Sequence, residues 1–225
     1  MNSFERFYAF MTKPLVILSY FVLIVLSFCY LDQPIAYFFY HLNLRVNFPL
    51  LNWITHAGLG GIYLSLFLLM ALYFRFIRPN KTWELRSWFL WFCIVIPSIV
   101  CTLLKIGLSR ARPDLLFKKQ IYGFYGFHLN AEFWSFPSGH ATTVMGVFLG
   151  LCVLFPRHLT SLLILGIILA SSRVLLFHHY LSDVLIASYL VLIQVGLIQY
   201  YLKKRGWNLT CESKCAQNNA PLYNL

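Results

Sequence analysis

Residues 87–104 read SWFLWFCIVIPSIVCTLL, an uncharged apolar run, and the chain continues directly into KIGLSRARP at residues 105–113. An apolar helix of about 20 residues is long enough to cross the hydrocarbon core of a bilayer. We therefore predict a membrane-spanning helix over 87–104, with basic side chains at the point where the chain leaves the membrane.

Apolar runs of similar length occur elsewhere, at residues 14–31, 58–74, 140–156, 160–177 and 183–202. Of the 225 residues, 60% are hydrophobic and 11% are charged, whereas a soluble domain has about 25% charged residues. The first run is interpreted as a span and not as a cleaved leader, because Leu31 is followed by Asp32-Gln33-Pro34 without a small-residue cleavage site. The sequence predicts an all-α bundle of six transmembrane helices. Residues 1–225 would form one membrane domain, with 105–139 as the long outer loop.

Lysine and arginine are distributed unevenly between the connections, and cytoplasmic connections are enriched in these residues. The side of the N-terminus would carry Arg6, Lys13, Arg75, Arg78, Lys81, Arg86, Arg157, Lys203, Lys204, Arg205 and Lys214. The opposite side would carry Arg45, Lys105, Arg110, Arg112, Lys118, Lys119 and Arg173. We therefore expect both termini in the cytoplasm. The net charge of +11 is spread over these connections, so it does not indicate a nucleic-acid partner.

The first of three polar clusters runs from Lys105 to Pro113. Lys105 and Arg112 are seven residues apart, close to two helical turns, so they could share one face of a helix. Pro113 disfavours helix at Arg112 and should mark the end of the segment. Two cations held near one point suit a phosphate, although cations that extend to the membrane interface would show the same pattern.

The second cluster, Phe136-Pro-Ser-Gly-His140, opens the fourth apolar run. Ser138 can cap a helix and Gly139 allows the backbone to approach a ligand closely. The amides at that helix start would bind an anion, with His140 beside it as a candidate acid. A plain helix cap with an interfacial histidine is the alternative.

The third cluster runs from Ser172 to Asp183 and contains Arg173 and His179. His179 and Asp183 are four residues apart, so on a helix their side chains would be in contact. A carboxylate that holds one imidazole nitrogen leaves the other as a nucleophile. A buried ion pair without catalysis is the alternative, but ionisable groups at membrane depth are functional candidates. In the six-span arrangement all three clusters lie on the same side of the membrane.

Together the clusters resemble the signature of the type 2 phosphatidic acid phosphatase superfamily, the integral membrane lipid phosphate phosphatases. That signature reads Lys-x6-Arg-Pro, then Pro-Ser-Gly-His, then Ser-Arg-x5-His-x3-Asp. Here it spans Lys105 to Pro113, Pro137 to His140, and Ser172 to Asp183, with every spacing met.

The resemblance implies a role for each matching residue. His179 would attack phosphorus and form a phosphohistidine, Asp183 would orient it, and His140 would protonate the leaving oxygen and then activate water. The cationic side chains of Lys105, Arg112 and Arg173 can supply the positive charge that a metal ion supplies in other enzymes, so no divalent ion or other cofactor is expected. The phosphoryl oxygens would be held by Lys105, Arg112, Arg173, Ser138 and the Gly139 amide.

The resemblance further implies hydrolysis of the terminal phosphate of a membrane lipid. Undecaprenyl diphosphate and phosphatidylglycerophosphate are the first candidates, ahead of phosphatidic acid and lipid A phosphate. Short loops suit a bacterial inner membrane protein whose site faces the periplasm or exterior. The expected partners are the lipid substrate and the bilayer, with no obligate protein partner.

Two other functions stay open at this point. A phosphotransferase would pass the phosphoryl group to a second lipid instead of water. A membrane scaffold or transporter would bind a lipid phosphate without turnover. A vanadium haloperoxidase would share the anion pocket, but its soluble architecture does not fit six apolar runs.

Overall fold

The computed structural model describes residues 1–56, 58, 60–207 and 209–211. The predicted single domain over 1–225 therefore includes residues, among them 212–225, that lie outside the described ranges. Within those ranges the regular structure is helical and contains no strand. The elements are α1 (Ser3–Met11), α2 (Pro14–Leu26), η1 (Ser27–Leu31), α3 (Asp32–Leu42), α4 (Leu44–Asn47), α5 (Pro49–His56), α6 (Gly60–Leu72), η2 (Tyr73–Ile77), α7 (Lys81–Leu108), α8 (Pro113–Lys119), η3 (Ala131–Phe133), α9 (Gly139–Leu154), η4 (Pro156–His158), α10 (Leu159–Leu175) and α11 (Leu181–Lys204).

The described residues of each predicted apolar run lie mostly in helices, but these helices differ in length. Among the described residues, five helical segments are long and apolar enough to cross a membrane, namely Pro14–Leu42, Gly60–Ile77, Lys81–Leu108, Pro156–Leu175 and Leu181–Lys204. The run predicted at 140–156 forms α9, which has 16 residues and is therefore about 24 Å long. The apolar helices indicate an integral membrane protein, whereas the count of six spans stays a prediction.

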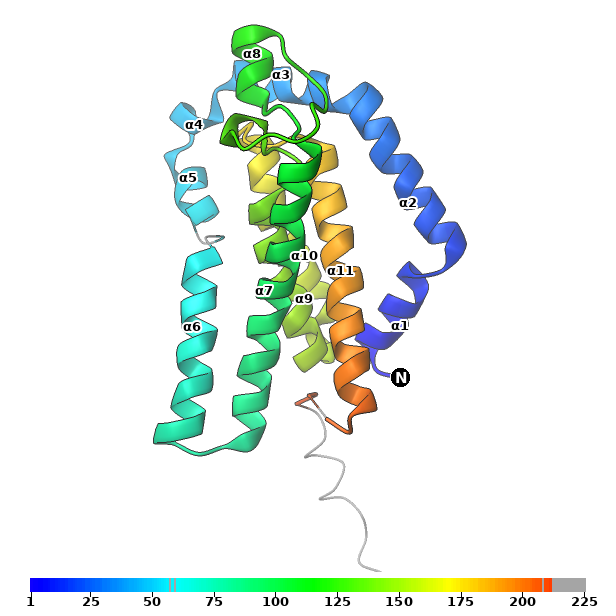
Figure 1. Ribbon diagram of the computed structural model, residues 1–225, viewed down its shortest axis with the longest axis vertical. Coiled ribbons are helices and arrows are strands. Elements are labelled where there is room, and N and C mark those ends of the chain that lie inside the picture. The colour runs from blue at the N-terminus through cyan, green and yellow to red at the C-terminus, as the bar shows by residue number, and fades with distance from the viewer. Residues whose placement is uncertain (57, 59, 208, 212–225) are drawn as a thin grey trace, which may run out of the picture.

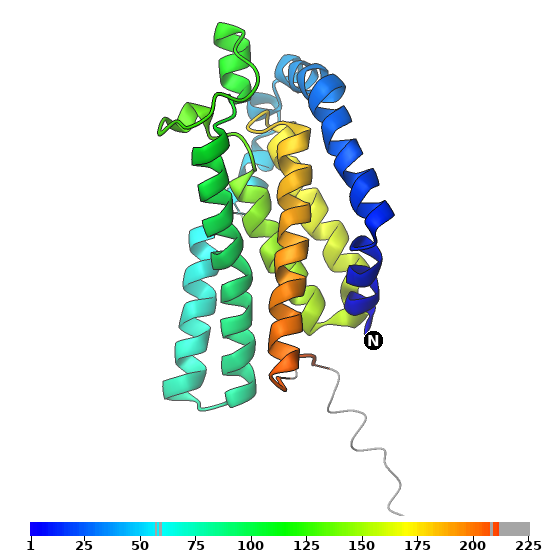
Figure 2. The ribbon, with the colours of Figure 1, turned by 45° about the vertical axis from the view of Figure 1, so that its right-hand side comes forward.

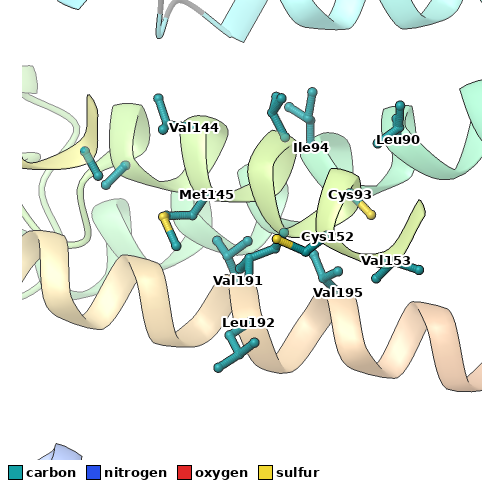
Figure 3. Packing of buried hydrophobic residues seen from close by; sticks show 14 of the residues in the cluster. Leu90, Cys93, Ile94, Val144, Met145, Cys152, Val153, Val191, Leu192 and Val195 are labelled. Atoms are coloured by element: carbon teal, nitrogen blue, oxygen red, sulfur yellow. The ribbon is translucent and has the colours of Figure 1, made fainter. Parts of the chain in front are cut away.

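Helix α9 is short because it is the centre of the bundle. It packs against α6, α7, α10 and α11, and most of its side chains are buried. In Figure 3 its Cys152 lies beside Val191 and Val195 of α11. A helix enclosed by other helices has little contact with lipid, so its length need not match the bilayer.

Two glycines one turn apart allow α9 to approach α7 closely. A Cβ atom at Gly146 would lie 2.4 Å from the carbonyl oxygen of Cys93, and one at Gly150 would lie 2.9 Å from the Leu90 side chain. Small residues four apart are a common contact between helices in membranes. Close packing at this pair fixes the end of α7 relative to the start of α9.

The first apolar segment stands at the edge of the bundle. Helix α2 runs alongside the bundle, and the chain bends at the π-helical η1 so that α3 crosses the end of the bundle (Figures 1 and 2). Extra residues in a helical turn are a known cause of such bends. The N-terminus and the end of α11 lie at the opposite end from α3 and α8 (Figure 1).

Candidate active site

The three predicted clusters meet at the end of the bundle that α3 and α8 occupy (Figure 1). Because α7 and α10 end there, while α9 and α11 begin there, residues far apart in sequence come together. The predicted residues occupy the last turn of α7 (Lys105), the N-cap of α8 (Arg112), the start of α9 (Ser138, Gly139, His140), the last turn of α10 (Arg173), and the loop and first turn of α11 (His179, Asp183).

The start of α9 is bonded to the start of α11. Ser138 is the N-cap residue, and its hydroxyl accepts a hydrogen bond from the Ala141 amide at 3.4 Å. The Ser138 amide donates to the carbonyl oxygen of Asp183 at 3.1 Å. Gly139 lies next to α7, since a Cβ atom there would be 3.6 Å from Cε of Lys105. Three helix ends thus share one small region.

The prediction that Lys105 and Arg112 share one helix face is wrong. Ser109 adopts a left-handed conformation, with φ 40° and ψ 76°, and ends α7. Arg112 has an extended backbone, with φ −75° and ψ 159°, because Pro113 follows it as the first residue of α8. The two cations nevertheless both act electrostatically on His179.

The helical arrangement predicted for His179 and Asp183 is also wrong, although their side chains lie close together. Helix α11 begins at Leu181, so His179 precedes the helix and only Asp183 lies in its first turn. The His179 amide donates to the carbonyl oxygen of Arg173 at 3.2 Å. Its Nδ1 lies 3.5 Å from Oδ2 of Asp183 and 2.8 Å from the carbonyl oxygen of Ser135.

The Ser135 carbonyl decides which imidazole nitrogen of His179 carries the proton. A carbonyl oxygen can only accept, so Nδ1 is protonated and Nε2 keeps its lone pair. Burial lowers the pKa of His179 to about 3, and Lys105 and Arg112 act in the same direction, while the interaction with Asp183 opposes them. The ring is therefore neutral at pH 7 and can act as a nucleophile through Nε2.

Asp183 is fully buried and is held by several donors. Its Oδ2 accepts from the Ser135 hydroxyl at 2.6 Å and from the Tyr180 amide at 2.9 Å, and its Oδ1 accepts from Nη1 of Arg110 at 2.5 Å. A carboxylate bonded in this way stays ionised and keeps one orientation. The interaction with Arg110 could not be inferred from the spacing of the motifs.

Arg173 and His140 act electrostatically on each other. Arg173 contacts the end of α5, and His140 contacts the chain between α5 and α6. Nη1 of Arg173 donates to the Thr55 hydroxyl at 3.1 Å, and the Ser172 hydroxyl lies 3.2 Å from the same oxygen. Gly58 packs on the imidazole of His140, where a Cβ atom would lie 2.0 Å from Cε1. The sequence assigned no role to Thr55 or Gly58.

Two buried guanidinium nitrogens and one buried imidazole nitrogen in this region have no hydrogen-bond partner among the described residues. They are Nε of Arg112, Nε of Arg173 and Nε2 of His140. An unsatisfied buried donor costs about 1–3 kcal/mol, and a phosphoryl oxygen would satisfy a guanidinium strongly. The arrangement thus suits a phosphate group.

His178 is engaged away from this pocket. Its Nδ1 lies 3.0 Å from Nη2 of Arg45. Burial lowers its pKa to about 2, with further contributions from Arg173 and Arg45. The geometry agrees with the choice of His179 over His178.

A sequence model of a family described as the PAP2 superfamily matches residues 86–207. The chain belongs to the PAP2 superfamily.

The matched PAP2 segment contains every site residue predicted from the motifs. Thr55 and Gly58 lie before it, as does Asp32, whose Oδ2 accepts a hydrogen bond from Nη2 of Arg110 at 2.7 Å. These three residues are therefore contributed by a part of the chain that the family model does not describe. Among these three, only Asp32 carried a signal in the sequence, because an ionisable residue at the end of an apolar run is a candidate for function.

Two curated relatives are similar to this PAP2 chain over part of their length. The lipid A 1-phosphatase of Rhizobium johnstonii is 34% identical over 136 residues, which are 55% of each chain. The lipid A 1-phosphatase of Rhizobium etli is 38% identical over 102 residues, which are 44% of each chain. The chain thus spans about half the length of the curated relatives it matches.

A solved structure is also similar to the chain. It is a transmembrane PAP2-type phosphatidylglycerolphosphate phosphatase from Bacillus subtilis, with 18% identity and a TM-score of 0.47. The similarity covers 89% of this chain and 92% of the other.

Proposed function

We propose that the chain hydrolyses the terminal phosphate of a membrane lipid through a phosphohistidine on His179. The observation that carries the proposal is the 2.8 Å contact between Nδ1 of His179 and the Ser135 carbonyl, which leaves Nε2 unprotonated. Membership in the PAP2 superfamily supports it.

The residues divide the reaction into two balanced steps. In the first, the Nε2 lone pair of His179 forms the bond to phosphorus, and the bond to the lipid oxygen breaks with its electron pair. That oxygen takes a proton from His140. The phosphate anion, which lies beside His140 and Arg173, favours the protonated form of His140. In the second, His140 removes a proton from water and the hydroxide oxygen forms a bond to phosphorus. The bond between phosphorus and Nε2 breaks, its electron pair returns to Nε2, and inorganic phosphate leaves while His179 is again neutral.

The cations have an electrostatic role in both steps. Lys105, Arg112 and Arg173 act on one another, and their mutual repulsion is relieved when the phosphoryl oxygens lie between them. The amide of Gly139 at the start of α9 adds a donor. Preorganised charge of this kind is what phosphoryl transfer chiefly requires, and the expectation that no divalent ion is needed stays part of the proposal.

A lipid A 1-phosphate is the first substrate to test, because both relatives are named lipid A 1-phosphatases. Undecaprenyl diphosphate, phosphatidylglycerophosphate and phosphatidic acid complete the panel. Purified protein in detergent should release inorganic phosphate from at least one of these lipids, and His179→Ala and His140→Ala should abolish that release while the protein stays folded. Transfer of phosphate to a second lipid without release would instead favour a phosphotransferase, and binding without turnover would favour a scaffold or transporter.

The same proposal includes a topology. The site would lie at the non-cytoplasmic face of a bacterial inner membrane, with six spans and both termini in the cytoplasm, as the distribution of lysine and arginine indicates. Single cysteines introduced at Lys119 and Lys204 in a cysteine-free variant test this. A membrane-impermeant maleimide added to spheroplasts should label position 119 and not position 204, and the opposite pattern would reverse the orientation.

A further inference from the structure

Arg110 is a fully buried guanidinium in the loop between α7 and α8. Its Nη1 bonds to Oδ1 of Asp183 at 2.5 Å and to the Ser182 hydroxyl at 2.7 Å. Its Nη2 bonds to Oδ2 of Asp32 at 2.7 Å and to the Tyr122 hydroxyl at 2.9 Å. One cation thus bridges the carboxylate beside His179 and a second carboxylate from the first apolar segment.

Aromatic rings enclose this guanidinium. Its Cζ lies 4.2 Å from the ring centre of Tyr180, 4.8 Å from that of Phe28, 5.2 Å from that of Tyr122 and 5.6 Å from that of Phe124. Although burial alone would lower the pKa of Arg110, Asp183 and Asp32 raise it above its ordinary value. Charges in surroundings that exclude water interact strongly, so the state of one carboxylate affects the other.

The carboxylate of Asp32, like that of Asp183, is held by several hydrogen-bond donors. It is 1% exposed and follows the π-helical η1 directly. Its Oδ1 accepts from the Ser27 hydroxyl and from the Ser182 amide, each at 3.0 Å, and the Ser182 hydroxyl bonds to its Oδ2. The bend at η1 therefore brings a carboxylate from outside the PAP2 segment to the start of α11.

We infer that Arg110 and Asp32 form a positioning pair that sets the orientation and effective charge of Asp183 beside the nucleophile His179. This inference rests on the proposed function. Two carboxylates and one guanidinium carry one net negative charge, so the cluster is not neutral. When phosphorus bonds to Nε2 while Nδ1 keeps its proton, the imidazole becomes cationic, and the negative cluster stabilises that cation.

Neutralising Asp32 and neutralising Arg110 change the net charge of the cluster in opposite directions. If Asp32 is neutralised, Arg110 cancels Asp183, and the cluster loses its net charge. If Arg110 is neutralised, two buried carboxylates repel each other and Asp183 loses the bond at Oδ1. If both are neutralised, Asp183 alone supplies one negative charge, as in the natural chain.

The test uses Asp32→Asn, Arg110→Gln and the double variant in the full chain, with a short-chain phosphatidic acid in detergent micelles as substrate. We expect kcat to fall about tenfold in Asp32→Asn, with KM changed by less than about twofold, and to fall about 100-fold in Arg110→Gln. In the double variant kcat should exceed that of Arg110→Gln by about tenfold, because the repulsion between two buried carboxylates is removed and residues in one charge network are coupled.

A second measurement does not require turnover. The pKa of His179, followed by NMR of ¹⁵N-histidine-labelled protein, should rise in Arg110→Gln, fall in Asp32→Asn and return toward the natural value in the double variant. The other charged or titratable groups that act on this ring (Asp183, Lys105, Arg112 and His178) are unchanged throughout. A merely structural role for the pair would not move the pKa in opposite directions.

The control pair is Arg75 and Glu84 at the opposite end of the bundle, where Nη1 and Oε1 lie 3.5 Å apart. Arg75→Gln, Glu84→Gln and their double variant should leave kcat and the pKa of His179 unchanged. If Arg110→Gln does not fold, the double variant is compared with Asp32→Asn. A double variant at least as active supports the inference, and a further tenfold loss overturns it.

The outcomes separate this inference from the proposed function. One outcome overturns the positioning pair and leaves the proposed function intact. In it the natural chain releases phosphate, the losses of the two single variants add up in the double variant, and the pKa of His179 does not move. No release from any lipid, with the expected opposite changes in pKa, overturns the proposed function and supports the pair.

Discussion

Gly58→Ala should impair proton transfer by His140 without removing any polar group. The added Cβ would lie 2.0 Å from Cε1 and 2.2 Å from Nε2 of the His140 ring. Ordinary contact begins at 3.4 Å, so the imidazole must move by about 1.4 Å. The φ angle of Gly58 is not in the left-handed region, so alanine meets a steric conflict and not backbone strain.

A displacement of about 1 Å from a reactive geometry can cost about 100-fold in rate, and loss of a general acid costs about 100-fold to 10,000-fold. We therefore expect kcat to fall about 100-fold for a lipid or alkyl phosphate, whose leaving oxygen needs a proton. For p-nitrophenyl phosphate the loss in the first step should be less than about tenfold, because nitrophenolate leaves without protonation. Release of nitrophenolate in the pre-steady state, with the enzyme in excess over the substrate, isolates that step.

Gly61→Ala is the matched control, because a Cβ atom there meets nothing within 4 Å. It should retain the natural kcat with both substrates. Inhibition of Gly58→Ala by the same vanadate concentrations that inhibit the natural chain would show that Lys105, Arg112 and Arg173 are still in place. Equal losses in the first step with the alkyl and nitrophenyl esters would refute the assignment of His140 as the acid, and an unchanged rate would refute the packing argument.

Three further outcomes are expected. Ser135→Ala removes the hydroxyl bond to Asp183, and because a hydrogen bond to a charged group contributes about 1.5–3 kcal/mol, kcat should fall by about tenfold to 100-fold; a rate within twofold of the natural one would contradict this. Phosphate release should be unchanged after exhaustive EDTA treatment, since cationic side chains surround the phosphate, and restoration of a lost activity by added Mg²⁺ would contradict it. The pKa values of His178 and His179 in the folded chain are lowered to about 2 and about 3. Below about pH 6.5 the unfolded chain therefore binds more protons than the folded chain. The free energy of unfolding in detergent should fall as the pH is lowered from 6.5 to 5, by up to about 1.4 kcal/mol per pH unit for each histidine. His178→Asn should flatten that dependence, and an equal slope in the variant would refute the assignment.

The bundle and the identities of the motif residues could be predicted because both depend on local sequence. Apolar runs of sufficient length are helical in a membrane whatever surrounds them, since their backbone groups must be satisfied internally. The same runs place Lys105, His140 and His179 at helix ends, so their gathering at one end of the bundle follows from the alternation of helix directions.

The local conformations of the motifs were harder to predict. A seven-residue spacing between Lys105 and Arg112 suggested a shared helix, but the left-handed Ser109 ends that helix and Pro113 starts the next. Likewise, the four-residue spacing of His179 and Asp183 suggested a helical pair, but α11 begins between them. Spacing alone does not distinguish a continuous helix from a helix end followed by a loop.

The sequence by itself determined an all-helical membrane chain with cationic and histidine side chains at the helix ends, because helix formation and side-chain chemistry are properties of short segments. Only the tertiary structure decided that the Ser135 carbonyl selects the tautomer of His179, that Gly58 supports His140, and that Asp32 shares Arg110 with Asp183. The physical reason is that these interactions join segments up to 151 residues apart along the chain, from Asp32 to Asp183. Their geometry is set by how closely the helices pack and by where the chain bends, which no single segment specifies.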